Sequence, residues 1–187
     1  EHDPDLQPLK SSPAWQKTIV PKLLDYYASN NKELAQMFAD DQNARLSGKF
    51  TDDLTQKDTQ RRTRVLQLIK ADALISGHDF YKAGMIMHHG TTTEDYQKAQ
   101  ELLEEAQRKK PMHFRAPWLL AASKDRLLLS QGKPQWYGTQ GMTVINGKIA
   151  LDPKLIDTSA VTPKQRKLSN APSIETLRTY LENFKSN

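Results

Sequence analysis

Apolar residues recur every three or four positions along most of this sequence, which is the spacing of one face of an α-helix. The recurrence stops at Gly132, where a stretch rich in glycine and amide side chains begins. The segments with the helical pattern are 31–48, 51–74, 79–90, 91–110 and 114–133. The sequence therefore predicts a mainly α-helical fold, built as a bundle of repeat-like helical hairpins.

Capping residues stand at the ends of several of these segments. Asn31 has the chemistry of a helix N-cap, and Gly132 is a typical C-terminal stop. Thr91 and Glu94 have the spacing of a capping box, in which each side chain bonds the other residue's backbone N–H. The first half of 51–74 is so polar that we expect part of it to be loop.

The N-terminal stretch has a different composition. Residues 1–13 contain three prolines and few apolar side chains, so we expect a flexible arm. A helix is expected over 21–29, just after this arm. Residues 14–187 suit a single domain, because a chain of 187 residues with 37% hydrophobic content can bury one core.

The period changes to alternation in MTVINGKIAL, residues 142–151. Asn146 and Gly147 at its centre form the dipeptide that a two-residue hairpin turn favours. The sequence predicts a β-hairpin over 142–151, which must pack on helices because two strands alone are marginally stable. A final amphipathic helix is expected over 173–184, capped by Ser173.

Charge and cysteine content exclude several classes of protein. The net charge is +5, but the charges are interspersed and the basic residues do not cluster with stacking aromatics, so nucleic-acid binding is not expected. The absence of cysteine excludes disulfides, thiolate catalysis and Cys-ligated zinc. No apolar run reaches the roughly 20 residues that span a bilayer, so membrane insertion is not expected. The compartment stays open, and we expect an exported location, periplasmic or secreted, in preference to the cytoplasm.

His88 and His89 lie where one helical pattern ends and the next begins. Adjacent side chains on a helix point about 100° apart, so the pair does not chelate one ion alone, and we expect no metal site. No phosphate-binding or dinucleotide motif is present, so no cofactor is expected either. The imidazoles either cap the carbonyls of the helix end or act on a ligand, His89 as a general base and His88 as a hydrogen-bonding group, because histidine titrates near neutrality.

Asp125 and Arg126 lie inside the mainly apolar stretch LLAASKDRLLLSQ. Charges in such a helix are unfavourable unless they are paired, hydrogen-bonded or at its edge. One interpretation is an exposed stripe that includes Lys124. The other is that Asp125 orients an arginine or histidine, while Arg126 offers its planar guanidinium to a carboxylate or phosphate.

Asp41 and Arg45 are four residues apart in DDQNAR, with Gln42 beside them. This spacing favours an ordinary ion pair on a helix surface, worth about 0.3–0.5 kcal/mol. The alternative is that the three polar side chains help to bind a ligand.

The stretch KPQWYGTQGMTVINGK, residues 133–148, has no helical period. Gly138 and Gly141 can take positive φ or let a ligand approach the backbone. A structural turn anchored by Trp136 is one interpretation, and a binding loop is the other. The polar side chains that would bind a ligand here are Gln135, Tyr137, Thr139 and Gln140.

Four segments together resemble an uncharacterised bacterial family of small helical proteins: ADDQNAR, MHHGTTTEDYQKAQELLEEA, LLAASKDRLLLSQGKPQWYGTQ and VTPKQRKLSNAPSIETLRTYL. The family pattern is D-Q-x-x-R, then Q-H-G, then D-R, then G-K-x-Q-x-Y-G-T-Q, with a late R-x-x-x-G-L-like segment. The Y-G-T-Q element is its most specific part. The stretch AGMIMHHGTTTEDYQKAQELLEEA also resembles one Sel1-type or tetratricopeptide helical unit.

The resemblance marks positions and implies no particular reaction. His88 stands where the family has glutamine, and Ser169-Asn170 replaces the late glycine. The matching positions are Asp41, Gln42, Arg45, His89, Asp125, Arg126, Gln135, Tyr137, Gly138, Thr139 and Gln140.

Two functional hypotheses follow. In the first, the polar residues converge on one pocket for a small polar or anionic molecule or a peptide-like ligand. His89 would be its acid or base, assisted by Asp125 and Tyr137, and any enzymatic activity would be acid–base hydrolysis or transfer. In the second, the chain is a non-catalytic helical scaffold that holds a protein partner, and its polar network is structural.

Overall fold

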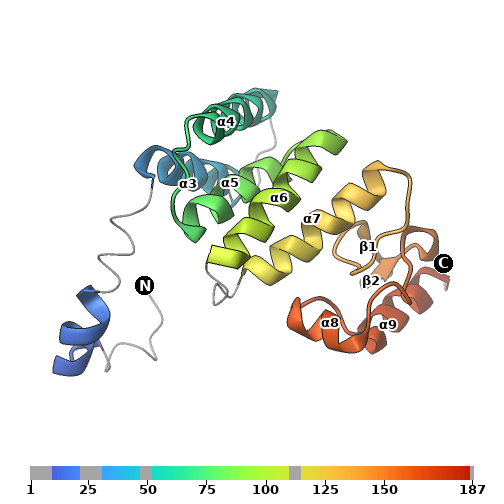
Figure 1. Cartoon of the computed structure of the whole chain (residues 1–187). Helices are drawn as coiled ribbons and strands as arrows, with labels where there is room; N and C mark the ends of the chain where they lie inside the picture. Colours follow the sequence, from blue (N-terminus) through green and yellow to red (C-terminus); the bar gives the residue numbers. More distant parts are fainter. Residues whose placement is uncertain (1–9, 22–30, 47–51, 110–114, 186–187) are drawn as a thin grey trace.

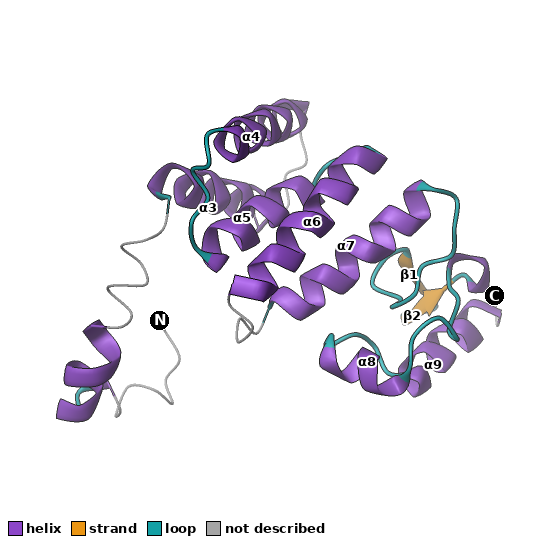
Figure 2. Cartoon of the chain, viewed as in Figure 1, coloured by secondary structure: helices purple, strands orange, loops and turns teal. Residues whose placement is uncertain are grey.

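The computed structural model of this chain is mainly helical with one two-stranded antiparallel sheet, as predicted (Figure 1 and Figure 2). The helix predicted over 21–29 lies outside the described residues except for its first position, as does most of the predicted arm. Near the N-terminus, η2 (Trp15–Ile19) is a short π-helix with no buried residue. None of the helices in the described part of the chain is long and apolar enough to span a membrane. The described residues are 10–21, 31–46, 52–109 and 115–185.

The first three long helices and part of the next helix, residues 93–109, surround the first core. The helices α3 (Lys32–Leu46) and α4 (Asp52–Lys70) both pack on α5 (Gly77–His88). Asn31 caps α3 as predicted, because its Oδ1 accepts a hydrogen bond of 2.9 Å from the Leu34 N–H. The buried side chains of this core are Leu34, Val65, Leu68, Leu74, Ala83, Ile86, Met87, Ala99 and Leu102.

The polar first half of α4 is helical, so the expectation of a loop there is wrong. Ion pairs explain the difference, because they join charged side chains within this half of α4 and connect it to α3. Asp58 accepts from Arg61 one turn along α4 at 2.9 Å and from Arg45 of α3 at 2.7 Å. A helix with few apolar residues is thus stabilised by charges that single-helix periodicity does not reveal.

The helix α6 (Thr93–Lys109) follows α5 and packs against it. Its capping box is Thr92 with Asp95, one residue later than predicted: the Thr92 Oγ1 accepts from the Asp95 N–H at 3.1 Å, and the Asp95 carboxylate accepts from the Thr92 N–H at 3.3 Å. The same carboxylate accepts from the Thr91 N–H at 3.1 Å. Asp95 therefore satisfies two backbone donors at once.

The helix α7 (Ala116–Ser130) packs on α6 and ends at the predicted glycine. Gly132 has a φ of +70° and its N–H donates to the Leu129 carbonyl at 3.0 Å. Lys133 N–H donates to the Leu128 carbonyl at 2.9 Å, which completes a glycine-based C-cap.

The remaining elements form a C-terminal unit (Figure 1). The predicted hairpin is present, with Asn146 and Gly147 at positive φ in its turn, and α9 packs on β2 as a lone hairpin requires. Ser173 caps α9 as predicted, since its Oγ accepts from the Thr176 N–H at 3.1 Å. The elements of this unit are β1 (Met142–Ile145), β2 (Lys148–Leu151), η3 (Pro153–Leu155), α8 (Pro163–Leu168) and α9 (Ile174–Lys185).

Candidate functional site

Asp41 lies at the centre of a polar cluster between α3 and α5. Its side chain is only 1% exposed and accepts from Arg45 Nη1 at 2.7 Å and from the Gln42 amide at 2.7 Å. His89 Nδ1 lies 3.0 Å from the same carboxylate. The predicted i,i+4 pair therefore forms, but around a buried carboxylate, where an unpaired charge would be strongly unfavourable.

The partners of Asp41 determine its ionisation. Burial by itself raises the pKa of the Asp41 carboxyl, but hydrogen bonding and charge from His89, with Arg45 and Gln42, outweigh burial and lower the pKa below its ordinary value. Asp41 is therefore an anion near neutral pH. An imidazole bonded through Nδ1 to a carboxylate has its Nε2 turned away from that partner, which is the arrangement of an oriented acid–base histidine.

His88 is next to His89 but lies in a different environment. Its side chain is buried, and its Nδ1 has no hydrogen-bond partner among the described residues. Burial, with the nearby positive charge of Arg126, lowers the pKa of His88 to about 2. His88 is therefore neutral at physiological pH and packs as a polar group within the core.

Asp125 organises the loop that follows α7. It is fully buried, so the exposed-stripe interpretation is wrong for this residue. Its Oδ1 accepts from the backbone N–H groups of Trp136 at 2.8 Å and Tyr137 at 2.9 Å. Its Oδ2 accepts from the Thr139 N–H at 2.9 Å and the Thr139 hydroxyl at 2.8 Å. The carboxylate thus orients loop backbone, and its hydrogen-bond partners among the described residues include no histidine.

Arg166 of α8 holds the same loop from the other side. Its side chain is 1% exposed and donates to the carbonyls of Trp136 at 2.6 Å and Tyr137 at 3.0 Å. Burial lowers the pKa of the guanidinium, and the nearby Asp125 carboxylate opposes this effect. Sequence analysis did not select Arg166, although the late R-x-x-x element of the family pattern contains it.

Arg126 joins the loop to α5. Its Nε donates to the Gln140 Oε1 at 3.1 Å and its Nη1 to the His88 carbonyl at 2.9 Å. The side chain of Gln135 makes two hydrogen bonds with the backbone of Gln140. Its Nε2 donates to the Gln140 carbonyl at 2.9 Å, and its Oε1 accepts from the Gln140 N–H at 3.0 Å. The D-R, Q-H-G and Y-G-T-Q elements therefore meet around one guanidinium.

All the candidate residues belong to two hydrogen-bonded clusters that meet at the His88–His89 peptide. Arg126 and Tyr137 line different hollows of the described residues, and His89 lines neither of these two. The first cluster holds Asp41, Gln42, Arg45 and His89, and the second holds His88, Asp125, Arg126, Gln135, Tyr137, Thr139 and Gln140.

The hollow at Arg126 has a volume of about 390 Å³. The guanidinium carbon lies 6.0 Å from the centre of the Tyr96 ring, and the other walls come from the α5–α6 turn, the end of α7 and Gln140. Among the described residues, no carboxylate oxygen lies within 4.0 Å of the Arg126 nitrogens. The lining residues are Thr91, Tyr96, Arg126, Leu129, Ser130 and Gln140.

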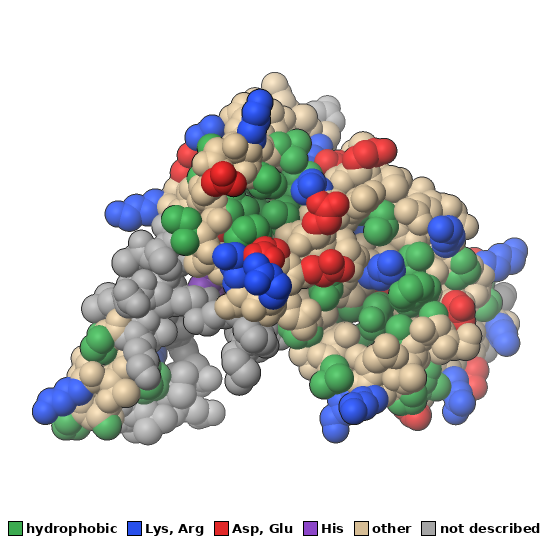
Figure 3. Space-filling view, viewed as in Figure 1, with side chains coloured by type: hydrophobic (Ala, Val, Ile, Leu, Met, Phe, Trp, Pro, Cys, Tyr) green, Lys and Arg blue, Asp and Glu red, His purple; other side chains and the backbone are tan. Residues whose placement is uncertain are grey.

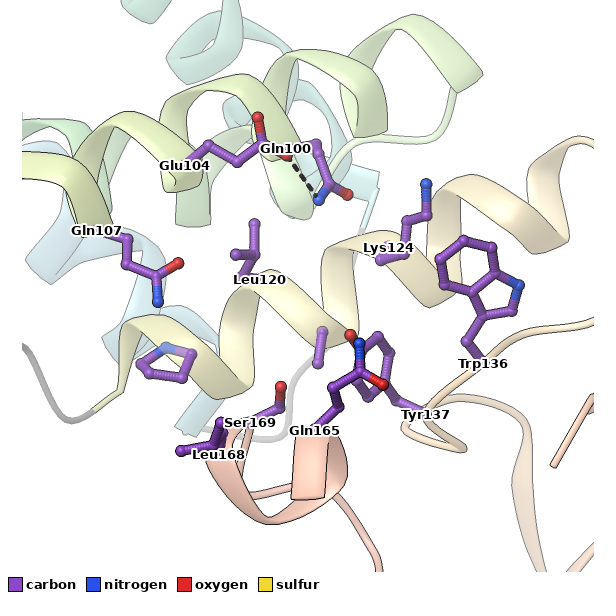
Figure 4. Close-up of a pocket in the computed structure, with 12 residues that line it drawn as sticks. Gln100, Glu104, Gln107, Leu120, Lys124, Trp136, Tyr137, Gln165, Leu168 and Ser169 are labelled. Atoms are coloured by element: carbon purple, nitrogen blue, oxygen red, sulfur yellow. Dashed lines mark hydrogen bonds between the residues drawn. The ribbon is translucent and has the colours of Figure 1, made fainter. Parts of the chain in front are cut away.

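A larger hollow of about 430 Å³ lies beside another part of α7. It is bordered by α6 and α8, and Trp136 and Tyr137 lie at one end (Figure 4). Sequence analysis selected Tyr137 from this set but missed Gln100, Lys124 and Gln165, because their placement depends on how helices distant in sequence pack.

The surface of the protein carries charges of both signs. On the face shown in Figure 3, basic and acidic side chains are interspersed, as the sequence predicts. Within the described part of the chain, no group of three or more His, Asp or Glu side chains is placed to hold a metal ion.

Comparison of the chain with protein-family models, curated proteins and solved structures finds no match.

Proposed function

We propose that this chain is a binding protein for a small anionic ligand, held in the hollow over Arg126. The supporting observation is that the guanidinium is oriented by two neutral acceptors, the His88 carbonyl and the Gln140 amide, at 2.9 and 3.1 Å. An arginine so fixed has donors left for a carboxylate or phosphate. By contrast, five other arginines already pair with a carboxylate: Arg45, Arg61, Arg62, Arg64 and Arg108.

The walls of the hollow suit such a ligand. Tyr96, Thr91 and Ser130 bring hydroxyl groups, and Gln140 brings an amide, to the cavity that contains the guanidinium. A charged group surrounded by a few neutral hydrogen-bonding groups is typical of small-molecule sites. The resemblance to the bacterial family supports the same choice, because three of its elements supply Arg126, Gln140 and the His88 carbonyl.

The catalytic roles predicted for His89, Asp125 and Tyr137 stay predictions. Asp125 uses both carboxylate oxygens to hold the loop, so in this proposal its role is to position Gln140 through Thr139. His89 is paired with Asp41 outside the Arg126 hollow, which favours binding over acid–base chemistry as the primary function.

A thermal-shift screen tests the proposal. We expect one or more of phosphate, citrate, succinate and N-acetyl dipeptides with a free carboxylate to raise the Tm of the full chain, because a ligand that binds only the folded state stabilises it. Arg126→Gln should abolish the shift.

Arg178→Gln is the matched control, because Arg178 is an exposed arginine of α9 outside the hollow. Its shift should equal that of the wild type. An absence of any shift with the wild type, or equal shifts in the wild type and Arg126→Gln, would refute the proposal.

A further inference from the structure

We infer that the hollow bordered by α6, α7 and α8 is a second binding site, which takes an extended peptide segment with an acidic side chain or a free carboxyl end. The site is separate from the Arg126 hollow and has no lining residue in common with it. Its volume of about 430 Å³ falls within the range of ligand-binding clefts.

The first argument is how firmly the two aromatic residues at the end of this hollow are held. Both backbone N–H groups of Trp136 and Tyr137 donate to Asp125, and both of their carbonyls accept from Arg166. Two buried charges are therefore used to fix four backbone groups of one dipeptide. A binding site needs this kind of support, because side chains on a loop are otherwise placed too loosely for recognition.

Gly138 strengthens this argument. Its φ is +75°, and a Cβ at this position would lie 2.5 Å from the Leu177 side chain. The loop therefore turns sharply and packs closely on α9 just after Tyr137. Both features keep the aromatic pair at the mouth of the hollow.

The second argument is the row of amide side chains along the walls. Gln100 and Gln107 are seven residues apart on α6, which is about 10 Å and matches about three residues of extended chain. Gln165 stands opposite, on α8 (Figure 4). Its Oε1 already accepts from Thr162, so its amide N–H groups are left to donate.

Amide side chains match the donor and acceptor of a peptide group. The Gln100 Oε1 is a buried acceptor with no hydrogen-bond partner in the described part of the chain, and a peptide N–H would satisfy it. Leu120, Ala121 and Leu168 supply apolar contact for side chains. The hollow therefore offers polar groups for a ligand backbone and apolar groups for its side chains.

The lining contains one acidic side chain, Glu104 of α6, whose carboxylate accepts from the Gln100 amide at 3.3 Å, and one basic side chain, Lys124 of α7. Lys124, beside Trp136, indicates where an acidic group of the peptide would bind. Its Nζ lies 4.7 Å from the centre of the Trp136 ring, and no carboxylate of the described residues lies within 4.0 Å of it. An acidic group on the ligand would pair with this ammonium. The same contact argues against a sugar, because the lysine covers the aromatic face on which a sugar ring would stack.

Selection from a phage-displayed library of random linear dodecapeptides on the full-length chain tests the inference. We expect enriched peptides that carry an acidic residue, and their synthetic forms should bind the wild type in a fluorescence-polarisation assay. Leu168→Asp and Lys124→Glu should each weaken binding at least tenfold. Both side chains line the hollow without being buried, so these variants are expected to fold.

Leu66→Asp and Lys133→Glu are the matched controls, because Leu66 is an exposed leucine of α4 and Lys133 an exposed lysine beyond α7. Both should bind as the wild type does, and so should Arg126→Gln, which separates this site from the proposed anion site. No enrichment, equal binding by all variants, loss of binding in Arg126→Gln, or binding of a glycan array in place of peptides would overturn the inference.

Discussion

Asp41 and Asp125 are both almost completely buried carboxylates, yet they are satisfied in opposite ways. Asp41 is held by side chains that can move or titrate: a guanidinium, an amide and an imidazole. Asp125 is held by three backbone N–H groups and one hydroxyl. The surroundings of Asp41 can therefore rearrange when its charge changes, whereas those of Asp125 cannot.

The difference separates a responsive region from a rigid one. Around Asp41, the lowered pKa of its own carboxyl, which depends on His89, Arg45 and Gln42, ties stability to pH. Around Asp125, backbone contacts fix the loop that supplies a wall to each of the two proposed sites. Three predictions test this contrast, from the largest expected effect to the smallest.

Asp125→Asn should reduce the free energy of unfolding by about 3–5 kcal/mol, because it places an amide N–H₂ against backbone donors and removes the anion near buried Arg166. Urea denaturation followed by circular dichroism measures the loss. A loss no larger than that of Asp41→Asn would show that the loop can relax and would end the contrast.

The second prediction concerns how His88 makes the free energy of unfolding depend on pH. Because the folded pKa of His88 is about 2, against 6.5 for an ordinary histidine, the unfolded chain binds the proton first as the pH falls below 6.5. The stability present above pH 6.5 is therefore lost on acidification, by about 1.4 kcal/mol per pH unit. Between pH 7.5 and 4.5, we expect the wild type to lose about 2–3 kcal/mol more than His88→Gln.

Urea denaturation at pH 7.5, 6.5, 5.5 and 4.5 checks this prediction. Glutamine is the residue that the resembling family has at this position, and it carries no titrating group. Parallel curves for the two proteins over the whole range would show that the His88 imidazole becomes protonated without unfolding.

Asp41→Asn should have the smallest of the three effects, a loss of about 1–2 kcal/mol in the free energy of unfolding at pH 7. The loss is small because Gln42 can turn its amide and Arg45 keeps its 2.7 Å ion pair with Asp58. Since the pKa of Asp41 is lowered, the wild type holds this advantage above about pH 3.8 and loses it as the pH falls through the folded pKa. Denaturation midpoints at pH 7 and pH 3 provide the measurement.

Lys57→Ala is the control for Asp41→Asn, because it removes an exposed i,i+4 pair with Asp53 whose side chains are 54% and 63% exposed. It should change stability by no more than about 0.5 kcal/mol. If Asp41→Asn matches this value, the Asp41 cluster is an ordinary surface pair despite its burial.

Local patterns were enough to predict most of the elements. The hairpin at Asn146-Gly147, the stop at Gly132 and the caps at Asn31 and Ser173 all depend on residues within a few positions of one another. The capping box was misplaced by one residue because Asp95 competes with Glu94 for nearby backbone donors. The helical first half of α4 was missed because its ion pair with Arg45 comes from another helix.

By itself, the sequence determined where α3 to α7, α9 and the hairpin form and which polar residues are unusual in their segments, whereas it did not predict α8. These properties follow from spacing and capping, which act over a few residues. Only the tertiary structure decided that Asp125 faces the loop backbone, that Arg166 clamps the same loop, and that Arg126 and Tyr137 line separate hollows. The partner of a buried charge is set by how distant helices pack, and that packing is a property of the whole core.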